Sequence, residues 1–237
     1  METNGLASLL VTDLLNIRYL TGFTGSNAAL LVSAQDSPVN EDHTVVCTDG
    51  RYVTQVAEQV PDLRAVIDRG SAAYLLRSDA APRAERVGFE SHVVTVDQHL
   101  SWTRIDDSLN LVRSPGLVEE LRMVKDEHEI ALLREACRAA DAAFAQLIER
   151  GSIRAGRTEL AVARELEAAM IEHGADGISF ETIVATGSNS AVPHHRPTAA
   201  VLAHGDFVKF DFGALVGGYH SDMTRTVVIG AASDWQK

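Results

Sequence analysis

Short apolar runs recur through the first half of the chain, and stretches with helical spacing separate several of them. The runs are rich in Val, Leu and Ile and cover residues 9–12, 28–32, 44–48, 64–67, 87–90 and 109–112. Between two of them, Tyr52, Val53, Val56 and Val60 repeat with the spacing of one helix face. Strands that alternate with helices predict an α/β layer built around a largely buried sheet. The polar residues 37–42 are expected to form a surface loop before the third strand.

The strand pattern stops near residues 113–116, where a Pro-Gly pair breaks the chain. We therefore predict a first domain over residues 1–113 and a linker over residues 114–122. A second domain is expected over residues 123–237. Its helices come first, and residues 178–230 then return to strand patterns, so the second domain is predicted to be α+β.

Two helices with clear boundary signals open the second domain. Asp126 and Glu129 have the spacing of a capping box at the start of the first helix, and Gly151 follows its end. Thr158 is expected to cap a second helix that runs to about residue 173, with Gly174 as its left-handed C-cap. The first helix carries an apolar stripe of period 3.6 formed by Ile130, Leu133, Ala136, Cys137, Ala140 and Phe144.

Composition and charge exclude several classes of protein. The chain has 237 residues, of which 46% are hydrophobic and 23% charged, as in soluble globular proteins rather than disordered or fibrous ones. With 21 Lys and Arg against 33 Asp and Glu, its net charge of -12 argues against nucleic acid as a partner. Cys47 and Cys137 lie far apart, which favours ordinary burial in a reducing compartment. No basic leader or membrane-length apolar run is present, so we expect a cytoplasmic protein without a membrane partner.

The most informative segment is a predicted hairpin near the C-terminal end. Residues 207–213 and 219–229 have strand patterns, and Gly217-Gly218 between them suits a two-residue turn. This pairing sets Asp211 opposite Thr224 and Gly213 opposite Asp222. The two aspartates then lie diagonally on one sheet face, about 7–8 Å apart by Cα.

Two carboxylates at that separation repel each other, and Asp is depleted in strands. A hard divalent cation, or a pair of them, would remove the repulsion through oxygen ligands. Gly213 is expected to leave space for such an ion. The alternative is that Asp211 and Asp222 are solvated side chains on an exposed hairpin face, and the pattern alone leaves both interpretations open.

A loop rich in Gly, Pro and His, residues 187–197, precedes the hairpin. A neutral imidazole beside a metal-held water can orient a substrate carbonyl or shuttle a proton. The alternative is that His194 and His195 are loop residues whose polar atoms are satisfied by backbone or water.

Taken together, these motifs resemble the pita-bread metallopeptidases, and within them the Xaa-Pro aminopeptidases and Xaa-Pro dipeptidases (prolidases). The catalytic part of the resemblance rests on Gly187-x-Asn189, Pro193-His194, Asp211 and Gly218-Tyr219-x-x-Asp222-Met223-Thr224-Arg225-Thr226. Residues 16–26 and 48–52 are similar to the creatinase-like N-terminal domain of these enzymes. A further motif resembles the start of the pita-bread fold: Leu121-Arg122-x-x-Lys125-x-x-x-Glu129-Ile130.

The resemblance implies hydrolysis of Xaa-Pro peptide bonds by a water that two divalent metal ions activate. The ions would be Mn²⁺, or else Co²⁺ or Zn²⁺, with Asp211 and Asp222 as the first two ligands. His194 would stabilise the tetrahedral intermediate, and Thr224 and Arg225 would support the ligands. The resemblance further implies proline-containing peptides as partners and a homo-oligomer, a dimer, formed through the N-terminal domain. The remaining candidates, His195, His204 and His220, match no ligand and are expected at the surface or lining the pocket.

The chain departs from the family in one respect. The family completes its site with one His and two Glu after the Asp-x-Thr-Arg-Thr segment, whereas residues 227–237 contain neither type. We therefore expect an incomplete pita-bread domain that exposes apolar surface and is inactive, or nearly so, as this 237-residue chain.

Three alternatives remain from the sequence. One is a non-catalytic pita-bread scaffold. Another is a metal-free creatinase-type C–N hydrolase, which would keep His194 but would not need the paired aspartates. Methionine aminopeptidases share the ligands, but they normally lack the N-terminal domain that residues 1–113 resemble. The sequence does not separate an aminopeptidase from a dipeptidase.

Overall fold

The computed structural model describes residues 5–34, 43–81 and 85–236. The chain divides into two compact units, Met1–Val124 and Lys125–Lys237. The loop expected at residues 37–42 lies outside the described residues. Within the described residues, every helix is too short or too polar to cross a membrane.

The first unit is built on one mixed sheet, which confirms the predicted α/β layer. In the described residues its strand order is β4-β3-β2-β1-β5-β6. Strand β2 is antiparallel to both of its neighbours, β1 and β3, whereas the other neighbouring pairs are parallel. The six predicted runs all form strands: β1 (Ser8–Val11), β2 (Ala28–Ser33), β3 (Val45–Thr48), β4 (Arg64–Ile67), β5 (Arg86–Phe89) and β6 (Asn110–Arg113).

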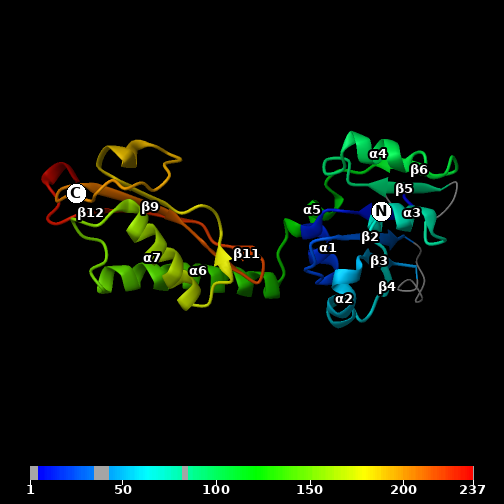
Figure 1. Ribbon diagram of the computed structural model, residues 1–237, viewed down its shortest axis with the longest axis horizontal. Helices are drawn as coiled ribbons and strands as arrows, with labels where there is room; N and C mark the ends of the chain where they lie inside the picture. Colours follow the sequence, from blue (N-terminus) through cyan, green and yellow to red (C-terminus); the bar gives the residue numbers. More distant parts are fainter. Residues whose placement is uncertain (1–4, 35–42, 82–84, 237) are drawn as a thin grey trace. The chain divides into compact units, whose positions relative to one another are not determined.

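Helices cover both faces of this sheet because successive strand residues point to opposite sides. Leu10 packs into a core with Leu75 and Trp102, whereas its neighbours Leu9 and Val11 pack into a second core with Ile17 and Val56. In Figure 1, α4 and α2 accordingly lie on opposite sides of the sheet. The helices of this unit are α1 (Leu14–Thr21), α2 (Val53–Gln59), α3 (Ser71–Arg77), α4 (Val96–Trp102) and α5 (Leu117–Arg122).

A buried polar network holds α5 to the first unit. The Glu90 carboxylate is 2% exposed and accepts hydrogen bonds from the Thr12 and Asp13 backbone amides and from Asn16 Nδ2 (2.6, 2.8 and 2.7 Å). Asn16 Nδ2 also donates to Glu119 on α5 (2.7 Å), and Arg122 Nη1 donates to Asn16 Oδ1 (2.8 Å). Much of the segment expected as a linker is therefore a helix with side-chain contacts to α1.

Two helices open the second unit, and their termini confirm the predicted signals. The first, α6 (Glu127–Glu149), begins with a reciprocal capping box in which Asp126 and Glu129 each accept the other's backbone N–H at 2.8 Å. The second, α7 (Glu159–Glu172), begins with the Thr158 side chain accepting the Ala161 N–H. The glycines that follow the helices, Gly151 and Gly174, have φ of 63° and 99°.

The buried face of α6 differs in part from the predicted stripe. Its core residues are Ala136, Ala139, Ala140, Ala143, Phe144 and Leu147. Cys137, which was expected to be buried, is exposed, whereas Cys47 in the first unit is buried as predicted. Cys137 lies with Ile130 and Leu133 on a second apolar flank of the helix that points away from the core. The predicted apolar stripe therefore combined residues of the buried face with residues of this outer flank.

The strands of the second unit form two small antiparallel sheets in the described residues, β12-β9-β8 and β11-β10-β7. Alternate residues of β9 (Val208, Phe210, Phe212) are buried against the helices, where Phe144 packs edge-to-face on Phe210 and stacks with Phe212. The intervening residues, including Asp211, therefore point to the opposite face. The strands are β7 (Gly177–Ile178), β8 (Ile183–Thr186), β9 (Phe207–Phe212), β10 (Ala214–Val216), β11 (Tyr219–His220) and β12 (Met223–Val228).

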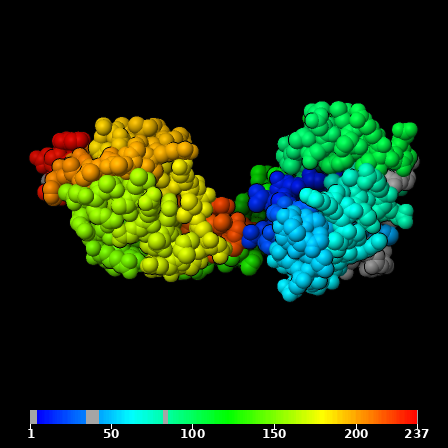
Figure 2. All heavy atoms as spheres, in the orientation of Figure 1, coloured from blue at the N-terminus to red at the C-terminus, as the bar shows by residue number. Residues whose placement is uncertain are grey.

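The loop between β8 and β9 lies on the side of the sheet away from α6 and α7 (Figure 1). It begins with a 3₁₀ helix, Gly187–Ala191, and contains the adjacent histidines His194 and His195. We call residues 187–198 the histidine loop. Figure 2 shows this region, coloured gold, as a layer distinct from the green helices of the same unit. The second unit is thus α+β, as predicted, with the sheet between the helices and the histidine loop.

Candidate metal centre

The predicted hairpin is confirmed in its register. Asp211 pairs with Thr224, and Val216 pairs with Tyr219 at the tip. Gly217 and Gly218 between them have φ of 56° and 86°, the left-handed region that a tight two-residue turn needs. The same register continues through the break between β9 and β10, so Asp222 lies opposite Gly213. Asp211 and Asp222 therefore share the sheet face that points away from α6 and α7.

Gly213 has a structural role that differs from the predicted one. A Cβ at this position would lie 1.9 Å from the Ser221 carbonyl oxygen and 2.9 Å from Ser179 Oγ. The space above Gly213 is therefore filled by protein, and the expectation that it admits an ion is wrong. Ser221 Oγ in turn donates to the Ala136 carbonyl of α6 at 3.1 Å, which fixes the hairpin on the helix beside Asp222.

The two aspartates and both loop histidines, His194 and His195, line the same cavity, of about 450 Å³. Strand β9 supplies Asp211, the start of β12 supplies Asp222, and the histidine loop supplies His194. Within the described part of the chain, neither aspartate carboxylate takes part in a hydrogen bond or ion pair, and His194 takes part in none. The other lining residues are Phe180, Glu181, Ile183 and Arg196.

The chemistry of these two carboxylates suits a hard divalent cation, because each offers oxygen atoms that no donor among residues 5–34, 43–81 and 85–236 occupies. They do not make a complete donor set. Among the residues that the structure describes, no group of three or more His, Cys, Asp or Glu side chains is placed to hold a metal ion. The described chain thus fits part of a metal centre, with Asp211 and Asp222 as the residues able to hold it.

Thr224 and Arg225, the two residues expected to support these aspartates, lie on opposite faces of the sheet because successive strand residues alternate in direction. Thr224 lies directly opposite Asp211 and shares its face. Arg225 lies opposite the buried Phe210, and so on the helix side of the sheet. There its guanidinium donates to the Thr224 carbonyl at 2.9 Å and lies 3.9 Å from the Asp141 carboxylate of α6.

Glu159, the first residue of α7, is a polar centre that the sequence analysis did not identify. Its side chain is fully buried, and the structure describes five hydrogen bonds to its carboxylate. One oxygen accepts from the Thr186 amide (2.8 Å) and Asn189 Nδ2 (3.0 Å). The other accepts from His195 Nε2 (2.8 Å) and from the Thr198 amide and hydroxyl (2.9 and 2.7 Å).

Burial and hydrogen bonding act on the Glu159 carboxyl in opposite directions. Burial alone would raise its pKa, but the hydrogen bonds from Asn189, His195, Thr186 and Thr198 together outweigh burial and lower the pKa to about 2. Glu159 is therefore a carboxylate at neutral pH. An acidic residue in the first turn of a helix is usually explained by the helix dipole, so nothing in the sequence distinguished this one.

A second attachment of the histidine loop comes from β9. Lys209 Nζ donates to the Val192 carbonyl at 2.6 Å and lies 3.2 Å from the Pro193 carbonyl. Lys209 is two residues before Asp211 and so points to the same face of the sheet. The other histidines named above, His204 and His220, are exposed and do not line this cavity.

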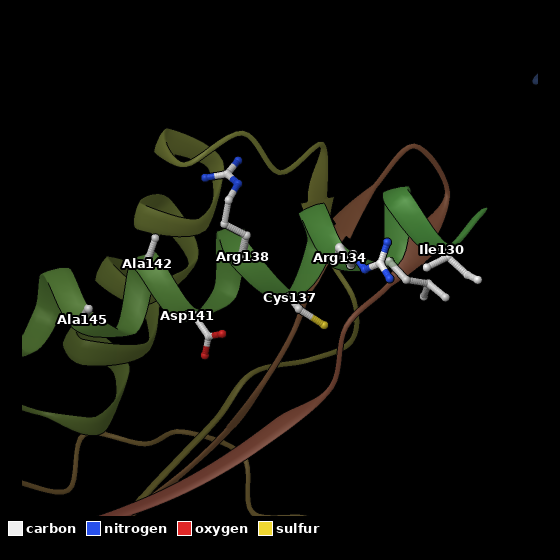
Figure 3. A pocket seen from close by; sticks show the side chains of 8 residues that line it. Ile130, Arg134, Cys137, Arg138, Asp141, Ala142 and Ala145 are labelled. Carbon is white, nitrogen blue, oxygen red and sulfur yellow. The ribbon is translucent and has the colours of Figure 1, made fainter. Parts of the chain in front are cut away.

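Another cavity, of about 680 Å³, lies along the outer flank of α6 (Figure 3). Side chains from successive turns of the helix form it, and they combine alanine and aliphatic groups with two arginines and one aspartate. This composition suits packing against another apolar surface better than catalysis. The lining residues are Ile130, Leu133, Arg134, Cys137, Arg138, Asp141, Ala142 and Ala145.

Comparison with known proteins places both units in one group. Residues 1–124 match the family described as "Creatinase/Prolidase N-terminal domain", and residues 131–237 match "Metallopeptidase family M24". A Bacillus subtilis protein named "Uncharacterized peptidase YqhT" is 37% identical over 235 residues, which are 98% of this chain and 64% of that protein.

Solved structures agree with the sequence matches. The Xaa-Pro dipeptidase from Bacillus anthracis superposes with a TM-score of 0.87 at 34% identity, covering 99% of this chain and 63% of that one. The X-Pro aminopeptidase from Thermotoga maritima has a TM-score of 0.85 at 30% identity, covering 98% and 65%. The chain thus spans slightly less than two thirds of the length of the relatives it matches. The chain therefore belongs to the creatinase/prolidase N-terminal domain family and combines that domain with part of a pita-bread domain that matches metallopeptidase family M24.

Proposed function

We propose that this chain forms part of a metal-dependent peptidase that cleaves Xaa-Pro peptide bonds. The observation that carries the proposal is the cavity lined by the carboxylates of Asp211 and Asp222 and the imidazole of His194, none of which has a bonding partner among the described residues. Relatives with Xaa-Pro dipeptidase and X-Pro aminopeptidase in their names support the choice of substrate.

Each of these residues has a defined task in the proposed reaction. Asp211 and Asp222 hold one or two divalent ions, with Mn²⁺ the first to test, and Thr224 borders Asp211 on the same face. A metal ion bound there polarises a carbonyl and lowers the pKa of water. His194 donates a hydrogen bond to the oxygen of the scissile carbonyl as negative charge develops on it. Arg225 supports the hairpin from the opposite face through its bond to the Thr224 carbonyl.

We also propose that the 237-residue chain alone turns over substrate slowly or not at all. The two carboxylates are the proposed metal ligands, the described residues include no group of three or more His, Cys, Asp or Glu placed to hold a metal ion, and metal affinity depends on the full donor set. The dimer expected through the N-terminal domain remains a prediction, for which analytical ultracentrifugation of the chain is the direct measurement.

The test is an assay of Ala-Pro dipeptide and of an Xaa-Pro-Xaa tripeptide with added Mn²⁺, run beside calorimetric Mn²⁺ binding. The matched control is the double variant D211N/D222N. We expect weak Mn²⁺ binding that the variant loses, with little or no hydrolysis. Robust hydrolysis that the variant abolishes would contradict the proposed inactivity. Hydrolysis that the variant retains would contradict the metal assignment and favour a metal-free C–N hydrolase.

The apolar cavity on α6 favours a second candidate, a scaffold that binds another protein surface. Its carboxylate pair would then have no metal to hold. Absence of any Mn²⁺ binding in the same calorimetry would favour the scaffold over the peptidase.

A further inference from the structure

The histidine loop is held on both sides of His194, by Glu159 from α7 and by Lys209 from β9. We propose that these two side chains are positioning residues that hold the loop so that His194 faces the carboxylates of Asp211 and Asp222. The inference rests on the proposed function for the role of His194, whereas the attachment of the loop stands on contacts within this chain.

Glu159 closes the base of the loop. It accepts the backbone N–H of Thr186, which precedes the loop, and that of Thr198, which ends it. One buried carboxylate therefore joins the two ends of the segment. Its bonds to the Asn189 and His195 side chains fix two further points in between. Because Glu159 begins α7, these bonds attach the loop to the helical layer of the unit.

Lys209 holds the other side of His194. Its ammonium group contacts the carbonyls of Val192 and Pro193, the two residues directly before His194. Since Lys209 and Asp211 lie two apart on β9, one strand carries both the attachment of the loop and a proposed metal ligand. The spacing between His194 and Asp211 is therefore set by a rigid element rather than by the loop itself.

The two attachments leave His194 itself free. Residues 192, 193 and 195 are bonded, whereas the exposed His194 makes no hydrogen bond within the described part of the chain. This is the arrangement expected of a side chain that must meet a substrate. Fixed neighbours reduce the conformational freedom that the imidazole would lose on binding.

The test uses NMR of the full 237-residue chain without metal or substrate. Glu159→Gln replaces one carboxylate oxygen by an amide nitrogen, which cannot accept from the donors that face it. The matched control is Glu165→Gln on the same helix, where Glu165 pairs with Arg157 at 2.6 Å. We expect the Thr186 and Thr198 amides of the Glu159 variant to exchange at least tenfold faster relative to the Phe210 amide, and no such selective change in the control.

A second pair of variants keeps the proposal testable if Glu159→Gln fails to fold. Lys209→Met removes the donor, and Lys209→Arg restores one. We expect the His194 ring signals to shift toward random-coil positions in the first variant and to return in the second. The inference would be overturned if Glu159→Gln changed the exchange of all amides uniformly, or if the His194 ring signals did not change in Lys209→Met. Failure of the unmodified chain to bind Mn²⁺ would instead sink the proposed function and leave these readouts unaffected.

Discussion

Two kinds of carboxylate occupy different regions of this chain. Those of Glu90 in the first unit and Glu159 in the second are buried and surrounded by N–H and O–H donors. Those of Asp211 and Asp222 line a cavity without a bonding partner in the described part of the chain. The first kind is committed to the fold, and the second remains available to a ligand.

The difference follows from where each carboxylate sits. Glu90 and Glu159 lie next to helix starts and loop ends, where backbone amides have no partner in a regular ladder. Asp211 lies within a strand whose amides are already paired with both neighbouring strands. A strand carboxylate therefore finds no local donors, and its oxygens stay free unless a cation or a substrate arrives.

The largest expected effect comes from neutralising a committed carboxylate. Glu90→Gln and Glu159→Gln each leave buried donors facing an amide NH₂, and we expect each to lower the free energy of unfolding by about 3 kcal/mol. Urea denaturation followed by unit-specific amide signals measures this. Glu135→Gln, which breaks an exposed pair with Arg138 on α6, serves as the control, with an expected change within about 0.5 kcal/mol. If both Glu90→Gln and Glu159→Gln lowered the free energy of unfolding by less than about 1 kcal/mol, the distinction between the two kinds of carboxylate would not hold.

A somewhat smaller effect is expected where the hairpin that carries the two aspartates is most tightly packed. Gly213→Ala forces a Cβ against the Ser221 carbonyl, and the backbone shift should cost about 2–3 kcal/mol and weaken Mn²⁺ binding. The control is Gly177→Ala, whose Cβ would meet only a Leu215 methyl group at 3.8 Å. Equal stability of the two variants in urea would show that the close approach at Gly213 is unimportant.

Stability in acid should depend on the committed carboxylate of Glu159. Its pKa is about 2 in the folded chain against an ordinary 4.5, so its contribution is complete above about pH 4.5 and is lost as the pH falls toward 2. We expect this loss to be about 2–3 kcal/mol in the second unit. The measurement is the urea midpoint of that unit at pH 6, 4 and 3. If Glu159→Gln retains the same dependence on pH, another group is responsible.

The smallest effect, opposite in sign, is expected at the available carboxylates. Asp211→Asn removes like-charge repulsion without leaving a donor unpaired, so the metal-free chain should gain up to about 0.5 kcal/mol. Asp222→Asn should behave alike. Urea denaturation in the presence of EDTA provides the measurement. A loss above about 1 kcal/mol would place Asp211 among the committed carboxylates.

The sequence predicted the parts of the fold that local signals determine. Apolar runs located the strands of the first unit, the Asp126–Glu129 capping box located the start of α6, and Gly217-Gly218 fixed the hairpin register. It did not predict features that depend on packing between distant segments. Cys137 has helical spacing with core residues but lies on the outer flank of α6.

The same limit applies to the site. The sequence brought Asp211 and Asp222 together through the register, but it could not show that Ser221 fills the space at Gly213. It also did not single out Glu159 or Lys209, because their partners lie in a loop whose path only tertiary structure determines. Helix and strand periods specify which face a residue occupies and say nothing of what a loop places over that face.

The most direct test of the account is an NMR titration of the unmodified chain with Mn²⁺, a paramagnetic ion. We predict saturable broadening of the Phe212 and Met223 amides and of the His194 ring, with weak affinity because only two carboxylate ligands are supplied. D211N/D222N should abolish the broadening. Unsaturable broadening, broadening centred elsewhere, or the same response in D211N/D222N would contradict the claim that these two aspartates form the metal-binding part of the site.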